Sequence, residues 1–335
     1  MLANIAFVSF ITNRFATTHD MNELWTLWLP IAFAAPLLWA MVSVLDLYFV
    51  HGLYRDEWDG TLISGAFQLL PWFLVPLGIL RFTAPPTEAM LFALAGGGMF
   101  LASFFFYFRA LFRYADSPLI HVLWNAAVLV VPVLAWAWSD ERLLPVHYLG
   151  IALAFVGSSL FAARDGLLRR GFLRVAGTMV WAVLLLSASM VLQKEAYRYA
   201  SNQFLDVYLI FSLGVVAAAT ALAVLKPRTT VARIRRFAGF EAKYIVLLVL
   251  AEGVSFIGTV FSQRALDLSP SPSFVAAIES SVPVFVMLLS LLLTGVFARL
   301  GREQASAMFR NQMLGWKEKL IAISLMSSGI YCIAG

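Results

Sequence analysis

Two stretches decide the fold of this chain: Phe106–Ala115, which reads FYFRALFRYA, and Phe261–Pro270, which reads FSQRALDLSP. An offset of 155 positions places the first stretch on the second and aligns the RAL tripeptide at Arg109 with the one at Arg264. The apolar runs that follow then coincide as well, without a gap until the connector 299–314. Similarity at one fixed offset is typical of a duplicated architecture. The chain therefore contains two related halves.

The composition excludes a water-soluble domain. Of 335 residues, 61% are apolar and only 13% are charged, whereas soluble domains average about 45–50% and about 25%. Most of the outer surface must therefore be apolar, which suits hydrocarbon rather than water. The net charge of +5 comes from basic residues scattered through short connectors, with no basic stripe. This pattern argues against nucleic acid as a partner and leaves membrane lipids as the surroundings.

Ten apolar runs are long enough to cross a bilayer, which needs about 20 residues per helix. They are Leu27–Val50, Thr61–Leu80, Ala89–Phe108, Pro118–Trp138, Leu144–Ala163, Leu173–Leu192, Phe204–Leu225, Ala242–Gln263, Ser273–Thr294 and Trp316–Ala334. Because five is an odd number, the second half must enter the membrane from the opposite side to the first. We predict an all-α integral membrane protein with ten transmembrane helices in two inverted five-helix repeats, residues 27–165 and 172–335.

The segment before the first run, residues 1–26, is treated separately. Its apolar part, Leu2–Asn13, is too short to span a bilayer and lacks the basic start of a signal peptide. We expect an N-terminal interfacial helix. The alternative is a signal-anchor, which would add an eleventh span.

Several short motifs recur in a fixed order in both halves. They are Arg109–Ala115, Asp140–Leu143, Gly150 and Gly157 in the first half, and Arg264–Pro270, Ser281–Phe285 and Gly329 in the second. Together they resemble the EamA-type halves of the drug/metabolite transporter superfamily, from about Leu27 to the C-terminus. The resemblance implies a ten-helix carrier of small molecules in the bacterial cytoplasmic (inner) membrane, acting as a monomer or a homodimer.

The two halves depart from each other at two of these motifs. Val128 occupies the position that Pro283 fills in the second half, and Gly295–Val296 replaces the acidic pair Asp140–Glu141. We therefore expect one half alone to perform whatever these features do.

Glu252 is the deepest charged residue in the predicted spans. It lies ten residues into the eighth run, which at about 1.5 Å per residue places it roughly 15 Å deep, where carriers bind cargo. Helical spacing puts Phe256, Thr259 and Gln263 on the same face. Because a buried charge is costly, we expect Glu252 to bind cargo or to couple transport to protons. The alternative is a structural glutamate tied to a buried polar partner.

Glu279 lies six residues into the ninth run, shortly before Pro283. Proline removes a backbone hydrogen bond, so we expect a disturbed helix whose carbonyls and carboxylate line the cavity. An ion pair with Arg264 is an equally weighted alternative. The offset places Trp124 and Asn125 opposite Glu279 and Ser280, with His121 one turn earlier. Such walls suit a cargo with a cationic or hydrogen-bonding end and an apolar end.

Other polar or aromatic residues within the spans are weaker candidates. Asp46 and Lys194 close the first and sixth runs; they could meet entering cargo, although we favour snorkelling toward the headgroups. Trp39, Tyr107 and Gln68 could line the cavity or could simply pack against neighbouring helices.

Enzyme and cofactor signatures are missing from the sequence. The single Cys332 cannot form an intrachain disulfide, and the four histidines are widely separated. Gly96-Gly97-Gly98 follows no predicted strand, so it indicates close helix packing rather than a phosphate loop. We expect no catalysis, no cofactor and no metal, and transport driven by a gradient.

The charges and the resemblance disagree on orientation. The side that holds both termini collects six of the 24 basic residues, namely Arg14, Arg81, Arg142, Lys194, Arg198 and Arg264. The positive-inside rule then places both termini outside the cytoplasm, whereas ten-span relatives usually keep them inside. We favour the charge count.

These observations together predict a secondary transporter, more consistent with an exporter, of a small polar or amphipathic metabolite such as an amino acid or amine. The mechanism is alternating access at a central cavity, with protons as a candidate coupling ion. The alternatives are a translocase of lipids or lipid-linked precursors and a non-transporting membrane subunit.

Overall fold

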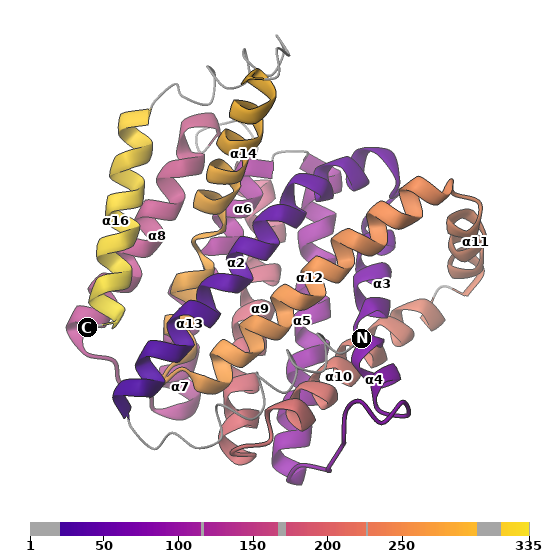
Figure 1. Cartoon of the computed structure of the whole chain (residues 1–335), viewed down its shortest axis with the longest axis horizontal. Helices are drawn as coiled ribbons and strands as arrows, with labels where there is room; N and C mark the ends of the chain where they lie inside the picture. The colour runs from indigo at the N-terminus through magenta and orange to yellow at the C-terminus, as the bar shows by residue number, and fades with distance from the viewer. Residues whose placement is uncertain (1–20, 115–116, 167–171, 226, 300–315, 335) are drawn as a thin grey trace.

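The computed structural model describes residues 21–114, 117–166, 172–225, 227–299 and 316–334, and every regular element among them is a helix (Figure 1). In chain order these are α2 (Met21–Gly52), α3 (Glu57–Phe67), α4 (Leu70–Leu74), α5 (Thr87–Tyr114), α6 (Ser117–Asn125), α7 (Ala127–Ser139), α8 (Pro145–Gly166), α9 (Phe172–Tyr199), α10 (Phe204–Leu225), α11 (Pro227–Ala238), α12 (Ala242–Leu268), α13 (Pro272–Glu279), α14 (Val282–Arg299) and α16 (Trp316–Ala334). The prediction of an all-α fold is confirmed. Leu2–Asn13 lies outside the described residues, and α2 already begins at Met21.

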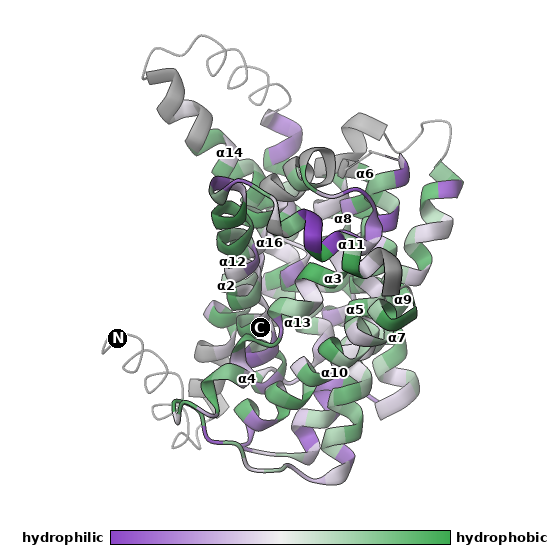
Figure 2. Ribbon diagram, turned by 90° about the vertical axis from the view of Figure 1, so that its right-hand side faces the viewer, coloured by the Kyte–Doolittle hydropathy of each residue, from purple (hydrophilic) through white to green (hydrophobic). Residues whose placement is uncertain are grey.

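Six helical stretches of the described chain are long and apolar enough to cross a membrane. They are Thr87–Tyr114, Leu119–Ser139, Phe172–Tyr199, Phe204–Leu225, Ala242–Leu268 and Pro272–Leu292. Large apolar side chains face outward, with Leu173, Leu225 and Tyr331 between 74% and 81% exposed. Hydrophobic residues recur along most of the described helices (Figure 2). Such a surface is unfavourable in water and suits lipid, as in an integral membrane protein.

The second predicted span, Thr61–Leu80, is not one continuous helix. It divides into α3 and α4 and then continues as turns that include Gly78, whose φ is +69°. Pro71 has no backbone N–H to continue α3, and it instead occupies the first turn of α4. At the other end of α3, the Asp56 side chain accepts hydrogen bonds from the backbone N–H groups of Trp58 and Asp59.

The fourth and ninth predicted spans are both broken near their middle. The ninth stops at Glu279 and resumes at Val282, as Pro283 predicts. The fourth stops at Asn125 and resumes at Ala127, although Val128 occupies the proline position there. The prediction that only one half carries this break is wrong, and the two breaks lie at the same place under the 155-residue offset.

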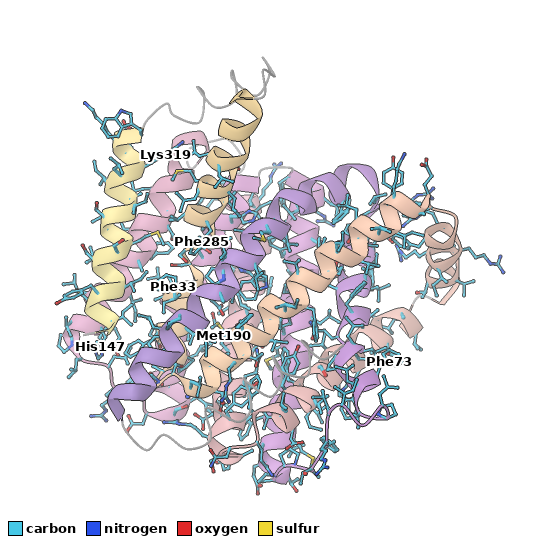
Figure 3. All side chains as sticks on the ribbon, in the orientation of Figure 1. Phe33, Phe73, His147, Met190, Phe285 and Lys319 are labelled. Atoms are coloured by element: carbon cyan, nitrogen blue, oxygen red, sulfur yellow. The ribbon has the colours of Figure 1, made fainter. Side chains whose placement is uncertain are left out.

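Three long helix pairs form the frame of the molecule: α5 packs along α9, α12 along α2, and α8 along α16. At the last crossing, a Cβ atom on Gly150 would lie 2.6 Å from the carbonyl oxygen of Gly329, so the backbones meet directly. Gly97 meets the backbone of Phe211 in the same way, as expected for the glycine triplet. Phe33 and Phe285 join α2 to α14, with ring centroids 6.4 Å apart (Figure 3).

Polar clusters lie at both ends of α12. Near its start, Asp59 of α3 is fully buried between Arg233 and Arg236 of α11 and forms ion pairs with both. At its end, the Lys194 ammonium of α9 donates to the carbonyl oxygens of Leu266, at 2.9 Å, and Asp267, at 3.3 Å. A cation at the C-terminus of a helix interacts favourably with its unpaired carbonyls. The cluster near the start of α12 joins α3 of the first half to α11 of the second half. The cluster at the end of α12 joins α9 to α12.

Candidate functional site

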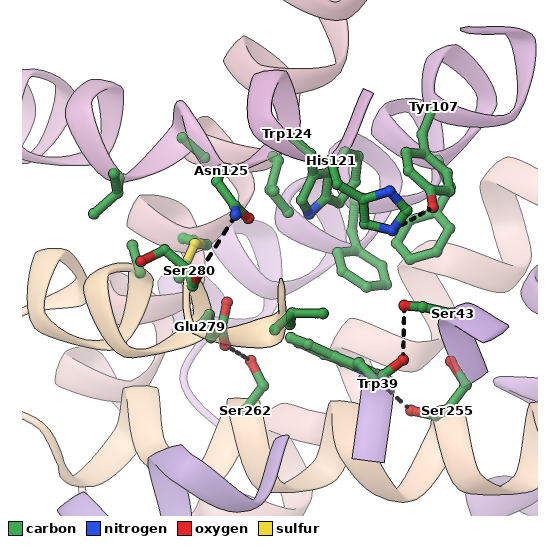
Figure 4. Close-up of a pocket in the computed structure, with 18 of the residues that line it drawn as sticks. Trp39, Ser43, Tyr107, His121, Trp124, Asn125, Ser255, Ser262, Glu279 and Ser280 are labelled. Atoms are coloured by element: carbon green, nitrogen blue, oxygen red, sulfur yellow. Dashed lines mark hydrogen bonds between the residues drawn. The ribbon is translucent and has the colours of Figure 1, made fainter. Parts of the chain in front are cut away.

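The two broken helices meet in the interior of the molecule. The side-chain amide of Asn125, at the end of α6, donates to the backbone carbonyl oxygen of Ser280, at 3.3 Å (Figure 4). In an unbroken helix that carbonyl would accept from Val284, but the Val284 N–H donates to Ser281 instead, at 2.9 Å. Asn125 therefore satisfies a carbonyl that the break exposes. Residues 125 and 280 are also the equivalent positions of the two sequence halves.

A central cavity of about 120 Å³ opens beside this contact. Its walls come from α2, α5, α6, α7, α9, α12, α13 and α14, so both halves of the sequence line it. Seven of the predicted site residues line it: Trp39, Tyr107, His121, Trp124, Asn125, Gln263 and Glu279. The sequence thus identified side chains that the fold brings together from five helices.

Glu279 is the one carboxylate among the described residues that line this cavity. It stands at the last position of α13, and the hydroxyl of Ser262 on α12 donates to its Oε1 (Figure 4). Pro283 has no N–H to pair with the Glu279 carbonyl, which accounts for the end of the helix here. Arg264, the alternative partner considered for Glu279, forms an ion pair with Asp267 on its own helix.

Aromatic rings form a second part of the cavity wall. Trp124 lies 5.0 Å from Tyr107 and 5.6 Å from Phe104 between ring centroids, both in edge-to-face arrangements. Trp39 of α2 lines the cavity as well, and its indole N–H donates to the backbone carbonyl of Ser255 at 3.4 Å. The Tyr107 hydroxyl lies 3.4 Å from His121 Nε2. The cavity therefore combines a carboxylate with an aromatic surface.

Gln193 lines the cavity and was not identified from the sequence. Its side chain is 1% exposed, and its Nε2 donates to the hydroxyl oxygen of Ser189. Ser189 in turn donates its hydrogen to the carbonyl of Gly96 at 2.8 Å. The only signal in the sequence is the spacing of Ser189 and Gln193 by four residues, which places two polar groups on one face of an apolar helix.

Glu252 faces a different and much smaller cavity, of about 10 Å³, which is room for about one water molecule. Its Oε1 accepts a hydrogen bond from the Ser64 hydroxyl at 3.0 Å. Phe256, Thr259 and Gln68 line this space too, and Gln68 accepts from the Tyr208 hydroxyl at 3.3 Å. The predicted polar face of α12 is therefore divided between two cavities, since Gln263 lines the larger one.

Three residues line both cavities and separate them: Phe100, Phe104 and Ser255. Two of them are phenylalanines, so the partition is mainly apolar. The two cavities thus lie side by side with one shared wall.

Lys194 and Asp46 are the two remaining predicted site residues. Lys194 was expected to snorkel to the headgroups, but it is 8% exposed and its ammonium is occupied by backbone carbonyls at the end of α12. That expectation is wrong, because the fold supplies acceptors closer than the lipid surface. Asp46 belongs to α2, and its side chain lies outside the described residues.

Glu141, in the connector between α7 and α8, lies at the same end as Lys194. Burial raises the pKa of its carboxyl group, and a hydrogen bond from Ser271 and the nearby charges of Arg198 and Lys194 oppose this rise. Of the acidic pair that distinguishes the first half, Glu141 thus belongs to an end cluster, whereas Asp140 is exposed and pairs with Arg142.

Comparison with known proteins provides a fold and no family. No protein-family model matches the sequence, and no curated protein matches it. A solved structure described as "Crystal structure of protein" matches 92% of this chain and 97% of its own, with a TM-score of 0.58 and 18% sequence identity. At this identity the likeness shows a shared fold alone.

Proposed function

We propose that this chain is a secondary transporter that moves a small amphipathic metabolite across the membrane by alternating access at the central cavity, with protons as the coupling ion. Ten helices in two inverted repeats, as in EamA-type carriers, form the proposed architecture. The proposed location is the bacterial cytoplasmic membrane, with both termini outside the cytoplasm as the basic residues favour.

The pattern of helix packing supports the repeat. The 155-residue offset places α5 on α12, and an offset of 148, which aligns Asp46 with Lys194, places α2 on α9. In the structure α5 packs along α9, and α12 packs along α2. The breaks at Asn125 and Ser280 are equivalent positions, and these two residues contact each other. A pseudo-two-fold axis between the halves accounts for a contact of this kind.

One observation carries the proposal: a cavity between the halves is lined by the carboxylate of Glu279 and by aromatic rings, beside two broken helices. Interrupted helices that expose backbone and side chains to an internal cavity are typical of carriers. A structural or subunit role requires no such chamber.

The two ends of α12 suggest how access alternates. The helix has 27 residues, so its ends are separated by about 40 Å, more than the thickness of the hydrocarbon core. In the proposed cycle, the ion pairs of Asp59 with Arg233 and Arg236 close the transport path at one end of α12. The contact of Lys194 with the α12 carbonyls closes the path at the other end. Alternating access would release one cluster while the other stays formed.

Reconstitution tests the proposal. The full chain in proteoliposomes is expected to accumulate a labelled amine or amino acid when preloaded with the same unlabelled compound, and Glu279→Gln is expected to abolish the exchange. Glu88→Gln, at an exposed position in the first turn of α5, serves as the matched control. Accumulation no higher than in empty liposomes across a panel of metabolites would contradict a transport function.

A further inference from the structure

We infer that the cavity recognises a cargo with a primary or secondary ammonium group and an aromatic or apolar body, and that it discriminates against zwitterionic amino acids and quaternary ammonium ions. The inference rests on the proposed function and narrows the substrate class of the same cavity.

The orientation of the Gln193 amide provides the first step. The single hydroxyl hydrogen of Ser189 is donated to the carbonyl of Gly96 at 2.8 Å. Ser189 can therefore only accept from Gln193, so the NH₂ group of Gln193 faces Ser189 and its Oε1 is an acceptor. That Oε1 atom is buried and has no hydrogen-bond partner among the residues that the structure describes. Gln193 lines the cavity, so a donor on a ligand that displaces the atoms covering this acceptor would satisfy it.

Glu279 provides the second step. A carboxylate has about four lone-pair sites, and Ser262 donates to one of its oxygens. The remaining acceptor capacity and the negative charge both favour a cation that donates hydrogen bonds. An ammonium group has N–H donors for Glu279 and for Gln193, whereas a quaternary nitrogen has none.

The aromatic wall provides the third step. Trp124, Tyr107 and Phe104 form a continuous set of rings with centroid separations from 5.0 to 6.3 Å. Ring faces attract cations, and ring edges and faces pack against aromatic or apolar groups. The cavity can therefore hold both the charged end and the apolar body of one amphipathic amine.

A carboxylate on the cargo has no matching cation in this cavity. Among the described residues that line it, none is Lys or Arg. The nearby Lys194 donates to backbone carbonyls, and Arg264 pairs with Asp267 and lies 4.9 Å from the ring of Phe204. His121 also lines the cavity, and its Nε2 lies 3.4 Å from the Tyr107 hydroxyl. Burying the carboxylate of an amino acid here would be unfavourable.

A series of matched probes tests the inference on the full chain in detergent. The probes are 2-phenylethylamine, phenylalanine, 3-phenylpropanoate and phenethyltrimethylammonium, each titrated by calorimetry at the same neutral pH. We expect 2-phenylethylamine to bind at least roughly tenfold more tightly than each of the others, because each of the others lacks the N–H donors or carries an unmatched carboxylate.

Two variants complete the test. Glu279→Gln is expected to weaken 2-phenylethylamine binding at least roughly tenfold, and Glu88→Gln is expected to leave it unchanged. The comparison of probes on the unmodified chain remains decisive even if Glu279→Gln does not fold.

The outcomes separate this inference from the carrier proposal. Phenylalanine binding as tightly as 2-phenylethylamine would overturn the inference, and exchange of phenylalanine in proteoliposomes would then still support a carrier. Tighter binding of the quaternary probe would overturn the role of Gln193 as an N–H acceptor. Failure of 2-phenylethylamine to bind at all would also overturn the inference, whatever other metabolites the vesicles exchange.

Discussion

Glu279 and Glu252 lie on helices that pack together, and each accepts a hydrogen bond from a serine hydroxyl on another helix. They nevertheless face spaces that differ about twelvefold in volume, about 120 Å³ for Glu279 and about 10 Å³ for Glu252. Depth along the helix favoured Glu252 as the binding carboxylate. Glu279 is therefore the proposed cargo carboxylate, because the larger cavity lies beside it, next to the break between α13 and α14.

The comparison suggests a division of roles. Glu279 would bind the cargo, and Glu252, beside a space for about one water molecule, would handle the coupled proton. The apolar partition of Phe100 and Phe104 lies between them.

The largest expected effect comes from exchanging each carboxylate for an amide. Glu279→Gln should lower the affinity for cargo by roughly 10- to 100-fold, since a hydrogen bond to a charged group contributes about 1.5–3 kcal/mol. Glu252→Gln should leave this affinity within about twofold and should remove the pH dependence of transport. Calorimetry and vesicle flux at several pH values measure the two effects. Equal losses of affinity in both variants would contradict the division of roles.

Replacing the serine that donates to each carboxylate should produce the same difference in cargo affinity, with a smaller loss. Ser262→Ala removes the donor that holds the Glu279 carboxylate in place, so affinity should fall about fivefold, which corresponds to about 1 kcal/mol. Ser64→Ala removes the equivalent donor of Glu252 and should leave cargo affinity unchanged. The same titration measures both, and a larger loss in Ser64→Ala would refute this assignment.

The break that gives Glu279 its cavity can be tested through Asn125. Asn125→Ala leaves the Ser280 carbonyl without its donor, so the free energy of unfolding should fall by about 1 kcal/mol, a decrease of roughly 2 °C in melting temperature. Ser43→Ala is the control, because the Ser43 hydroxyl donates only within its own helix, to the carbonyl of Trp39. Equal melting temperatures for the Asn125 variant and the unmodified chain would show that this contact does not stabilise the break.

Glu141 provides a third case, because its carboxyl group lines neither cavity. Burial raises its pKa, so the folded state binds the proton more tightly than the unfolded state does. Its contribution to stability is therefore present at acidic pH and is lost as the pH rises through the raised value. Glu141→Gln should raise the melting temperature slightly at neutral pH and not at acidic pH. The exposed Glu318→Gln should show no such pH-dependent gain, and a loss of stability in Glu141→Gln at neutral pH would contradict this account.

The sequence predicted the all-α fold and much of the cavity lining because both depend on simple properties. Helix length and apolar composition predict membrane helices, and the offset aligned Trp124 and Asn125 with Glu279 and Ser280. The break at Asn125 was not predictable in this way, since no proline marks it and the local sequence is compatible with a helix. At this break Asn125 contacts the Ser280 carbonyl in the other half, a long-range contact that the local sequence does not reveal.

The remaining site predictions were limited because the sequence does not show how each helix is rotated about its own axis in the fold. The spacing that placed Glu252 and Gln263 on one face of α12 is correct, but that face borders two cavities separated by rings of α5. Gln193 was missed because its importance depends on Ser189 and Gly96, which fix its amide through a chain of hydrogen bonds. Lys194 was misplaced because nothing local to it reveals the carbonyls at the end of α12.

Asn125 and Ser280 are related by the 155-residue offset and contact each other in the structure. Had two identical, separately encoded units assembled about a dyad, positions equivalent to Trp124 and Glu279 would have carried the same residue, and every mutation would have altered both walls together. If the proposed inverted repeat arose from such a unit, joining its copies in one polypeptide would release them from that constraint. Trp124 and Glu279, which are related by the 155-residue offset, could then differ, and the cavity that both line would have chemically distinct sides.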